Sequence, residues 1–342
     1  METLHFVQGD MASEKMFTMP TTLPLPTLRA VFGDRLQEHV LLAPYTSARI
    51  GGPADALLSV TSADELAGTV ARLWELDIPY VILGGGSNML VSDRGVRGVV
   101  VLNRAKGVRF DPGPLSQGHR LRDGVRSTGA GKGSRPKVQA EAGVVVANLA
   151  RRAASHGLAG LEWAAAVPGT IGGAVYGNAG AFGGDMAGSL IHAELLTEQG
   201  RVSWSVEKME YGYRTSLLKR QALKIVVLSA QLHLEHSTKE VVSVKINEFS
   251  ERRRATQPPG ASMGSMFKNP PGDFAGRLIE AAGLKGKRIG TAGISPVHAN
   301  FFINHGQTKA EDVRALVNLA QKTVAEVFGI NLELEIELVG EW

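Results

Sequence analysis

The chain has 342 residues, of which 44% are hydrophobic and 20% charged, with a formal net charge of +4 and no cysteine. This length exceeds one ordinary core, so we expect a globular protein of two or three domains. The lack of cysteine excludes disulfides, iron–sulfur clusters, thiolate zinc sites and a cysteine nucleophile.

The sequence indicates an intracellular protein without membrane or nucleic-acid partners. No apolar run reaches the roughly 18 to 20 residues that span a bilayer, and residues 1–16 have no apolar segment of the signal-peptide kind. The basic excess is mild and spread out, which fits an anionic ligand better than nucleic acid. No His or carboxylate cluster has metal-ligand spacing. We therefore predict cytoplasmic localisation and no metal.

The first part of the chain predicts a loose extension followed by a small subdomain. Residues 1–32 lack hydrophobic periodicity and carry prolines at 20, 24 and 26, so we expect regular structure to begin near residue 40. Within 33–105, Ser62 and Glu65 have the spacing of a capping box, which predicts a helix to about Leu76. The expected strands of this subdomain are 55–60, 79–83 and 98–102.

A second subdomain is predicted over 106–234. It contains 110–136, a stretch rich in Gly, Ser, Arg and Pro with almost no apolar spacing, which we interpret as a mobile insertion. The other expected elements are strand 137–141, helix 145–156 ending at Gly157, and strands 190–197 and 223–233.

The remaining residues, 235–342, predict a C-terminal domain. Thr308 and Glu311 form another capping-box pattern, opening a helix that runs to Phe328. The other expected elements are helices 238–254 and 273–282 and a strand over 331–339. Strands and helices alternate without a βαβ repeat, so the predicted fold class is α+β.

The stretch VILGGGSNMLVS at 81–92 places three glycines and a Ser-Asn pair between two apolar runs. Successive exposed N–H groups in such a turn can bind an anion, although a plain tight turn explains the residues equally well. No Gly-Lys-Ser/Thr follows, which excludes a Walker loop, and an apolar run in place of a helix excludes a Rossmann fingerprint.

Residues 167–185, VPGTIGGAVYGNAGAFGGD, contain seven glycines. So many glycines disfavour a stable helix or the centre of a sheet. The stretch either packs as a coiled loop or lets a flat ligand lie on the backbone. Two such stretches, each beside β-structure, favour one extended dinucleotide bound between them.

Six motifs in order identify a family resemblance. They are TSARIGGPAD (46–55), LGGGSNMLVSD (83–93), the 167–185 stretch, GYRTS (212–216), GSMFKNP (264–270) and ELEIELVG (333–340). Together they resemble the UDP-N-acetylenolpyruvoylglucosamine reductase family, also called UDP-N-acetylmuramate dehydrogenase, over about residues 35 to 342. The chain resembles the shorter subtype, which lacks a substrate-covering insert after GYRTS.

The resemblance implies an FAD-binding domain of the vanillyl-alcohol-oxidase type, made of two α+β subdomains, and a C-terminal α+β domain for the UDP-sugar. The implied cofactor-binding residues are Arg49, Gly51, Gly84, Gly85, Gly86, Ser87, Asn88, Pro168, Gly169, Gly172, Gly173, Ala174, Asn178 and Gly180. Relatives that attach flavin covalently often place a His at the end of the glycine turn. This chain has Asn88 there, so non-covalent FAD is expected.

The implied reaction reduces an enolpyruvyl ether in peptidoglycan precursor synthesis, with electrons passing from NADPH through FAD to UDP-N-acetylenolpyruvoylglucosamine. By resemblance, Arg214 stabilises the enolate carboxylate, Ser265 donates the proton and Glu335 assists charge stabilisation. Without the family resemblance, the sequence favours a surface arginine at Arg214 and a turn serine at Ser265. Glu335 then belongs to one solvated strand face that it shares with its alternating neighbours, Glu333 and Glu337.

Substrate contacts are expected at Tyr213, Lys268 and Asn269, with Arg254, Gln257 and His298 as weaker candidates. Phe182 stands where the family often has Tyr, which removes a hydroxyl contact. We expect a monomer. Two other functions stay open: an FAD oxidase of the same superfamily that acts on an alcohol or hydroxy acid, and a nucleotide-sugar sensor without turnover.

Overall fold

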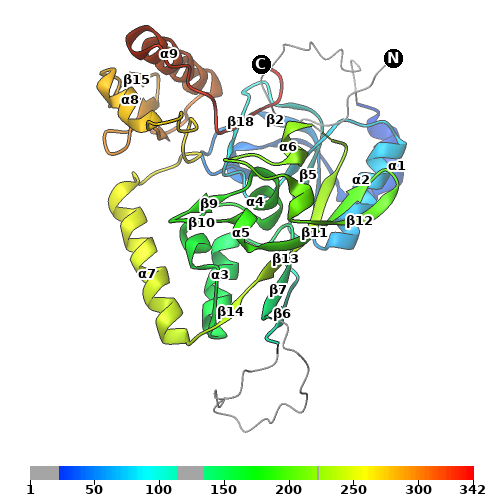
Figure 1. Cartoon of the computed structure of the whole chain (residues 1–342). Helices are drawn as coiled ribbons and strands as arrows, with labels where there is room; N and C mark the ends of the chain where they lie inside the picture. The colour runs from blue at the N-terminus through cyan, green and yellow to red at the C-terminus, as the bar shows by residue number, and fades with distance from the viewer. Residues whose placement is uncertain (1–22, 114–134, 222) are drawn as a thin grey trace.

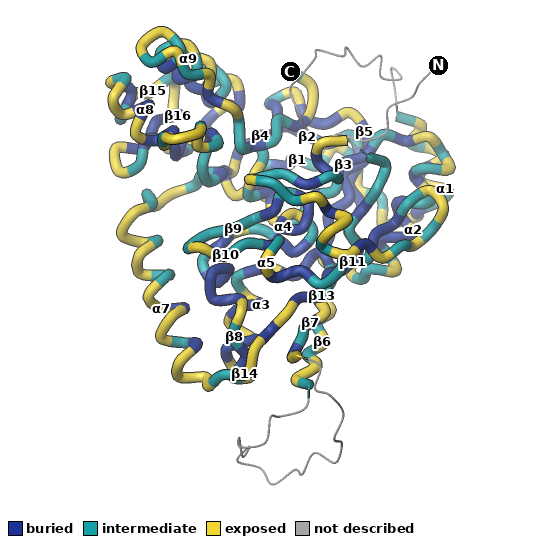
Figure 2. The backbone as a smooth tube through the Cα atoms, viewed as in Figure 1, coloured by how far each residue is buried: buried dark blue, intermediate teal, exposed yellow. Residues whose placement is uncertain are grey.

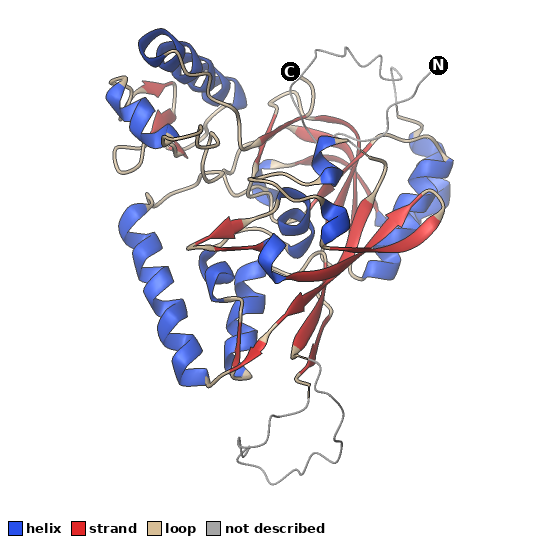
Figure 3. Ribbon diagram, viewed as in Figure 1, coloured by secondary structure: helices blue, strands red, loops and turns tan. Residues whose placement is uncertain are grey.

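The computed structural model describes residues 23–113, 135–221 and 223–342 (Figure 1). Residues 1–22 of the expected extension and most of the expected 110–136 insertion lie outside these ranges. The described chain forms two larger sheets with their helices, one mixed and four-stranded and the other antiparallel and five-stranded. A smaller C-terminal unit lies at one corner (Figure 3).

The first subdomain is a four-stranded sheet covered by helices. Its strand order is β1 (Leu36–Leu41), β2 (Pro53–Val60), β5 (Val96–Asn103), β3 (Tyr80–Leu83), with β2 and β3 both parallel to β5. Helix α2 (Ala63–Glu75) packs on one face. The Ser62 hydroxyl accepts from the Glu65 peptide N–H at 3.1 Å, as predicted, whereas the Glu65 carboxylate accepts from Thr61.

Helix α1 (Leu25–Phe32) corrects the expectation of a loose extension through residue 32. Leu28 and Phe32 are buried in the core of the first subdomain. Pro24 and Pro26 lie at the start of the helix, where a missing N–H costs nothing and the fixed φ suits the first turn. The prolines that suggested irregular chain therefore begin a helix.

The second subdomain is an antiparallel five-stranded sheet. Its order is β12 (Gly200–Ser205), β11 (Leu190–Thr197), β13 (Val226–His233), β7 (Lys137–Glu141), β6 (Val108–Asp111). Strands β7 and β11 have the predicted bounds, whereas β12 was not predicted. Helices α3 (Val146–Ser155), α4 (Ile171–Gly177), α5 (Met186–Ser189) and α6 (Leu217–Arg220) belong to this subdomain.

Helix α7 (Lys239–Thr256) runs beside α3 (Figure 3). Val242 and Ile246 are buried in the core of the second subdomain, while the outer face of α7 is exposed (Figure 2). Helix α7 therefore packs on the core of the second subdomain.

The C-terminal unit packs helices α8 (Ala275–Ala281) and α9 (Ala310–Phe328) on a three-stranded sheet. This sheet contains β15 (Arg288–Ile289), β16 (Ala292–Ile294) and β17 (Phe302–Asn304). The predicted strand 331–339 is shorter: β18 spans Glu337–Val339 and pairs in parallel with β4 (Met89–Val91), so the chain end returns to the first subdomain.

Short elements complete the described chain. They are β8 (Leu158–Ala159), β9 (Gly180–Ala181), β10 (Gly184–Asp185), β14 (Glu235–His236) and the 3-10 turns η1 (Gly33–Arg35), η2 (Ala43–Tyr45), η3 (Glu162–Ala166) and η4 (Glu207–Met209).

The predicted capping box at Thr308 is wrong, because the start of α9 is capped from another subdomain. The Thr308 hydroxyl donates to the Thr291 carbonyl at 2.9 Å. Instead, the Asp93 carboxylate accepts from the peptide N–H groups of Ala310 and Glu311, at 2.9 and 3.0 Å. Asp93 follows β4, so this cap joins the C-terminal unit to the strand that leaves the glycine turn.

We expect Asp93→Ala to lower the free energy of unfolding by about 1–2 kcal/mol, because two N–H groups at a helix start lose their acceptor and the helix dipole loses a negative charge. Denaturant unfolding measures this loss. Asp34→Ala is the control, since Asp34 is exposed and caps no helix in the described structure. Equal stability of the two variants would contradict the capping role.

Candidate active site

A cavity of about 330 Å³ lies where the three units meet. Its walls come from the glycine turn after β3, the segment before and within α4, the GYRTS turn, and the chain on either side of Ser265 and Glu335. The two glycine-rich stretches that the sequence indicated therefore face one cavity.

The turn at 84–88 has the features of an anion-binding turn. Within the described chain, the peptide N–H groups of residues 85–88 donate to no other protein group. A Cβ on Gly84 would lie 2.4 Å from the Thr170 hydroxyl, and one on Gly85 3.1 Å from Gly169 Cα. The turn and the 168–170 segment approach closely because Gly84, Gly85 and Gly169 carry no side chain there, which leaves unused donors beside the cavity.

The 167–174 segment forms the opposite wall. The Gly172 N–H donates to the Ala142 carbonyl at 2.8 Å, which anchors the start of α4. Gly173 is exposed, and nothing lies within 4 Å of where its Cβ would be. A flat group can therefore lie against the backbone at this point. The expectation that the glycines disfavour a helix is wrong, because Ile171–Gly177 form helix α4.

We expect Gly86→Ala to abolish retention of FAD. Gly86 has φ +58°, and its Cβ would lie 2.5 Å from the Tyr45 carbonyl oxygen and 2.7 Å from Thr46 Cα, so the turn must shift. The 450-nm absorbance of the purified protein, per chain, measures bound flavin. Gly68→Ala is the control, because no atom lies within 4 Å of its Cβ position in α2. Full flavin content in Gly86→Ala would show that the turn tolerates the side chain.

Eleven of the fourteen predicted cofactor residues line the cavity, and three do not. Arg49 is exposed, and its guanidinium donates to the Pro44 carbonyl at 3.4 Å. Gly51 packs against Val91. Asn178 is buried and ends α4 in left-handed geometry. Its side-chain amide donates to the Gly212 carbonyl and accepts from the Ala187 N–H. In the structure, these three residues contact other parts of the protein and do not line the cavity.

Asn88 lines the cavity and also holds two units together. Its side-chain amide donates to the Glu335 carbonyl at 3.0 Å, and its own carbonyl accepts from the Glu337 N–H at 2.9 Å. The end of the glycine turn thus positions the chain segment that carries Glu335.

Arg214 and Glu335 form an ion pair at the cavity, with 2.8 Å between Arg214 Nε and Glu335 Oε1. Arg214 has φ +56° in the tight turn between Gly212 and Thr215, and its Nη1 donates to the Gly180 carbonyl at 3.0 Å. Burial raises the pKa of Glu335 above its ordinary value; the charges of Arg214, Lys219 and Lys268 oppose this rise.

Backbone pairing brings Ser265 to the same place. The Glu335 N–H donates to the Met266 carbonyl at 2.9 Å, and the Lys268 N–H donates to the Glu333 carbonyl at 2.9 Å. The segment after Ser265 therefore runs antiparallel to the segment that ends at Glu335. Ser265, Glu335 and Arg214 all line the cavity, so the structure brings the three predicted catalytic residues together.

The three alternating glutamates do not share one solvated face, which their spacing alone would predict. The Glu333 side chain is 76% exposed, but those of Glu335 and Glu337 are each 16% exposed and pair with cations. Glu337 lies 2.5 Å from the ammonium of Lys219, which is buried in α6 and lines the cavity. Sequence reasoning missed Lys219. The only signal was its place three residues after the helix cap Ser216.

The three predicted substrate residues lie outside the cavity wall. Tyr213 is 57% exposed and lies beside the Arg214 guanidinium. Lys268 pairs with Glu333 at 3.3 Å, and the Asn269 side chain accepts from the Ala275 N–H at 3.1 Å. Their role toward substrate stays a prediction.

The weaker candidates for substrate contacts lie in different places. Gln257 lines the cavity, whereas Arg254 lines a neighbouring groove. His298 packs its ring against Phe301, and its Nδ1 accepts from the Asn300 N–H, which is a structural arrangement. Phe182 stacks on Phe249 with ring centroids 4.6 Å apart.

The described residues carry neither a metal cluster nor a membrane-spanning helix. They contain no cluster of three or more His, Asp or Glu side chains arranged to hold a metal ion. No helix among them is both long and apolar enough to cross a membrane.

Residues 54–205 match the family described as "FAD binding domain", and residues 256–339 match the C-terminal domain of UDP-N-acetylenolpyruvoylglucosamine reductase. The second match begins at the end of α7, in agreement with the packing. A reductase of this name from Chloroflexus aggregans is 42% identical over 308 residues, covering 89% of this chain and 97% of the relative. One from Rubrobacter xylanophilus is 42% identical over 300 residues, 88% and 94% of the two chains.

Among solved structures, UDP-N-acetylenolpyruvylglucosamine reductase from Thermus caldophilus is 35% identical and superposes with a TM-score of 0.70, covering 89% of this chain and 99% of that one. The fold and the cavity thus define a flavoprotein with an FAD-binding domain and an α+β C-terminal domain. The chain belongs to the UDP-N-acetylenolpyruvoylglucosamine reductase family.

Proposed function

We propose that Arg214, Ser265 and Glu335 are the reaction centre of this family member. The observation that carries the proposal is their convergence on one cavity, with Arg214 and Glu335 in direct contact. The protein is an FAD-dependent oxidoreductase that reduces UDP-N-acetylenolpyruvoylglucosamine with NADPH, a step of peptidoglycan precursor synthesis.

The residues at the glycine turn fit the pyrophosphate of FAD, because their unused N–H donors line the cavity and no side chain blocks the backbone. Residues Gly84 to Asn88 and Pro168 to Ala174 would hold the cofactor. FAD held by these residues would supply hydride transfer between NADPH and the substrate. With Asn88 at the end of the turn and no cysteine in the chain, we propose that FAD is bound without a covalent link.

Arg214 would stabilise the negative charge that gathers on the substrate carboxylate. A guanidinium stays charged and can grip a carboxylate at two points. Its Nη1 bond to Gly180 and its contact with Glu335 hold it in place. This pre-organisation removes the cost of orienting the cation when the charge develops.

Ser265 would give a proton to the carbon beside the carboxylate. A hydroxyl is a weak acid, but it is adequate toward a carbanion-like enolate. Ser265 follows Gly264, which has φ +81°, and the antiparallel pairing with the Glu335 segment holds its backbone. Glu335, which contacts Arg214 at 2.8 Å, would assist charge stabilisation from the same wall.

The remaining parts of the proposal concern substrate and setting. Tyr213, Lys268 and Asn269 would contact the UDP-sugar, and the protein would act as a cytoplasmic monomer. The three domains would be 33–105, 106–234 together with α7, and the C-terminal unit. An FAD oxidase of the same superfamily is not favoured, because the C-terminal domain matches the reductase family.

Two half-reactions, observed separately without oxygen, test the function. NADPH should bleach the yellow protein, and UDP-N-acetylenolpyruvoylglucosamine should then restore the colour. A protein that bleaches but does not recover with this substrate would refute the substrate assignment. Rapid recovery with oxygen alone would support an oxidase.

A further inference from the structure

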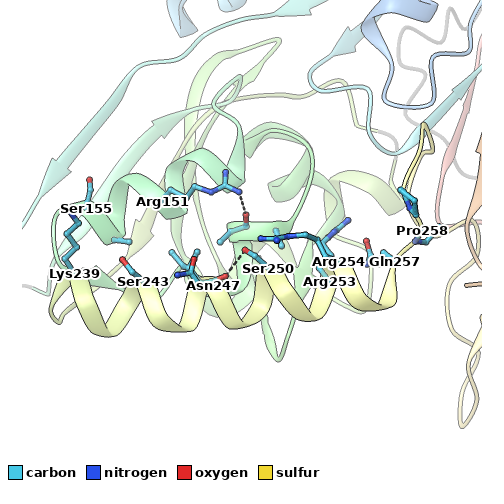
Figure 4. Close-up of a pocket in the computed structure, with 15 residues that line it drawn as sticks. Arg151, Ser155, Lys239, Ser243, Asn247, Ser250, Arg253, Arg254, Gln257 and Pro258 are labelled. Atoms are coloured by element: carbon cyan, nitrogen blue, oxygen red, sulfur yellow. Dashed lines mark hydrogen bonds between the residues drawn. The ribbon is translucent and has the colours of Figure 1, made fainter. Parts of the chain in front are cut away.

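A second cavity, of about 840 Å³, lies between α3, η3 and α7 (Figure 4). We call it the α3–α7 groove. It is lined by four cations, five uncharged polar side chains and no carboxylate: Arg151, Lys239, Arg253 and Arg254, with Ser155, Ser243, Asn247, Ser250 and Gln257. A concave wall with one sign of charge concentrates the opposite charge, so the groove suits an anionic ligand that also accepts hydrogen bonds.

The cations of the groove are not neutralised by the protein. Among the described residues, Lys239, Arg253 and Arg254 form no ion pair. The acids of α7 lie elsewhere on the helix: Glu240, Glu248 and Glu251 are exposed and do not line the groove. The carboxylates of α7 therefore point away from the groove, whereas three of its cations, Lys239, Arg253 and Arg254, line it.

Two of the cations are held in defined positions. Arg151 projects from α3 toward α7, and its Nη2 donates to the Ala165 carbonyl at 3.1 Å (Figure 4). Arg253 is half-buried, and burial lowers the pKa of its guanidinium, which nevertheless stays charged near neutral pH. A half-buried cation without a partner is costly, and an anionic ligand would offset that cost.

The groove adjoins the flavin cavity. Arg253 and Gln257 line both. From Arg253 back to Lys239, α7 extends about 21 Å at 1.5 Å per residue. A ligand that places one end in the flavin cavity can therefore extend along α7 and meet cations at both ends of the groove.

We propose that the α3–α7 groove binds the adenosine 2′-phosphate end of NADPH. The inference rests on the proposed function, because the nicotinamide must reach the flavin while the rest of the molecule leaves the cavity. The UDP-sugar is the other anionic ligand. Its main candidate residues Tyr213, Lys268 and Asn269 line neither the groove nor the cavity, whereas the weaker candidates Arg254 and Gln257 line the groove, so the test must separate the two ligands. The 2′-phosphate is the group that NADH lacks, so the groove makes the protein prefer NADPH.

The test changes the end of the groove that is remote from the flavin. In the FAD-loaded protein, the double variant Arg151→Gln/Lys239→Gln should weaken NADP⁺ binding about tenfold or more by titration calorimetry. NAD⁺ binding should stay within about twofold, because the lost contacts are to the 2′-phosphate. The NADPH-to-NADH ratio of kcat/KM for flavin reduction should fall by the same factor.

A matched control is available on the same two helices. Arg152→Gln/Lys245→Gln removes equal charge from α3 and α7, but neither residue lines the groove. This variant should keep NADP⁺ affinity within about twofold. Tenfold weakening in the control as well would show a general charge effect and overturn the proposal, and so would unchanged NADP⁺ affinity in the groove variant.

Two further outcomes in the groove variant would also overturn the proposal. One is equal weakening of NADP⁺ and NAD⁺ binding, and the other is weakened binding of UDP-N-acetylenolpyruvoylglucosamine alone, which would assign the groove to the substrate. Reoxidation of dithionite-reduced protein by the substrate tests the proposed function without NADPH. The experiments therefore distinguish an error in the proposed NADPH-binding role of the groove from an error in the proposed function.

Discussion

Ser265→Ala should slow reoxidation of the reduced protein by UDP-N-acetylenolpyruvoylglucosamine by about 10²- to 10⁴-fold, the usual contribution of a positioned proton donor. Reduction by NADPH should keep its rate, because no proton passes from Ser265 in that half-reaction. Anaerobic stopped-flow absorbance measures both steps. The two rates separate a proton-donor role from a general disturbance of the site, which would slow both.

Ser262→Ala is the matched control for this variant. Ser262 lies three residues earlier on the same segment, is also half-buried, and lines neither cavity. It should leave both half-reactions within about twofold. If Ser265→Ala slows both half-reactions equally, or neither, Ser265 is not the proton donor.

Glu335→Gln should slow the same reoxidation step about a hundredfold and change its pH dependence. The amide keeps the shape and the contact with Arg214 but cannot supply or lose a proton. Burial raises the pKa of Glu335 above 4.5, so the rate of the unmodified protein should fall as pH rises through that raised pKa. The rate of the variant should lack this fall.

The free energy of unfolding should also depend on pH through Glu335, in a direction that its raised pKa determines. The folded protein binds the Glu335 proton more tightly than the unfolded chain, because the folded pKa is raised. The contribution of Glu335 to the free energy of unfolding is therefore full below pH 4.5 and is lost as pH rises through the folded pKa. Unfolding of Glu335→Gln should lack that part of the pH dependence. A pH profile identical to that of the unmodified protein would assign the titration to another group.

Local patterns in the sequence predicted many of the regular elements, and the family resemblance indicated eleven residues that line the cavity. Strands β7 and β11 appear with the expected bounds, because an apolar alternation bounded by turns needs little tertiary information. The glycine turn at 84–88 was also readable, since glycine is needed where two backbones approach closely. Errors arose where distant contacts decide: the cap of α9 comes from Asp93, more than two hundred residues away.

The sequence by itself determined the absence of cysteine chemistry, the α+β class and the six ordered motifs that indicate a flavin-dependent reductase. It could not choose Glu335 over Glu333 and Glu337, because all three share a period of two. Only the tertiary structure decided this: the chain pairs with the segment after Ser265 and turns Glu335 toward Arg214. In the same way, Lys219 and Arg253 resemble any exposed cation in the sequence. Burial distinguishes them, and burial is a property of the packed fold.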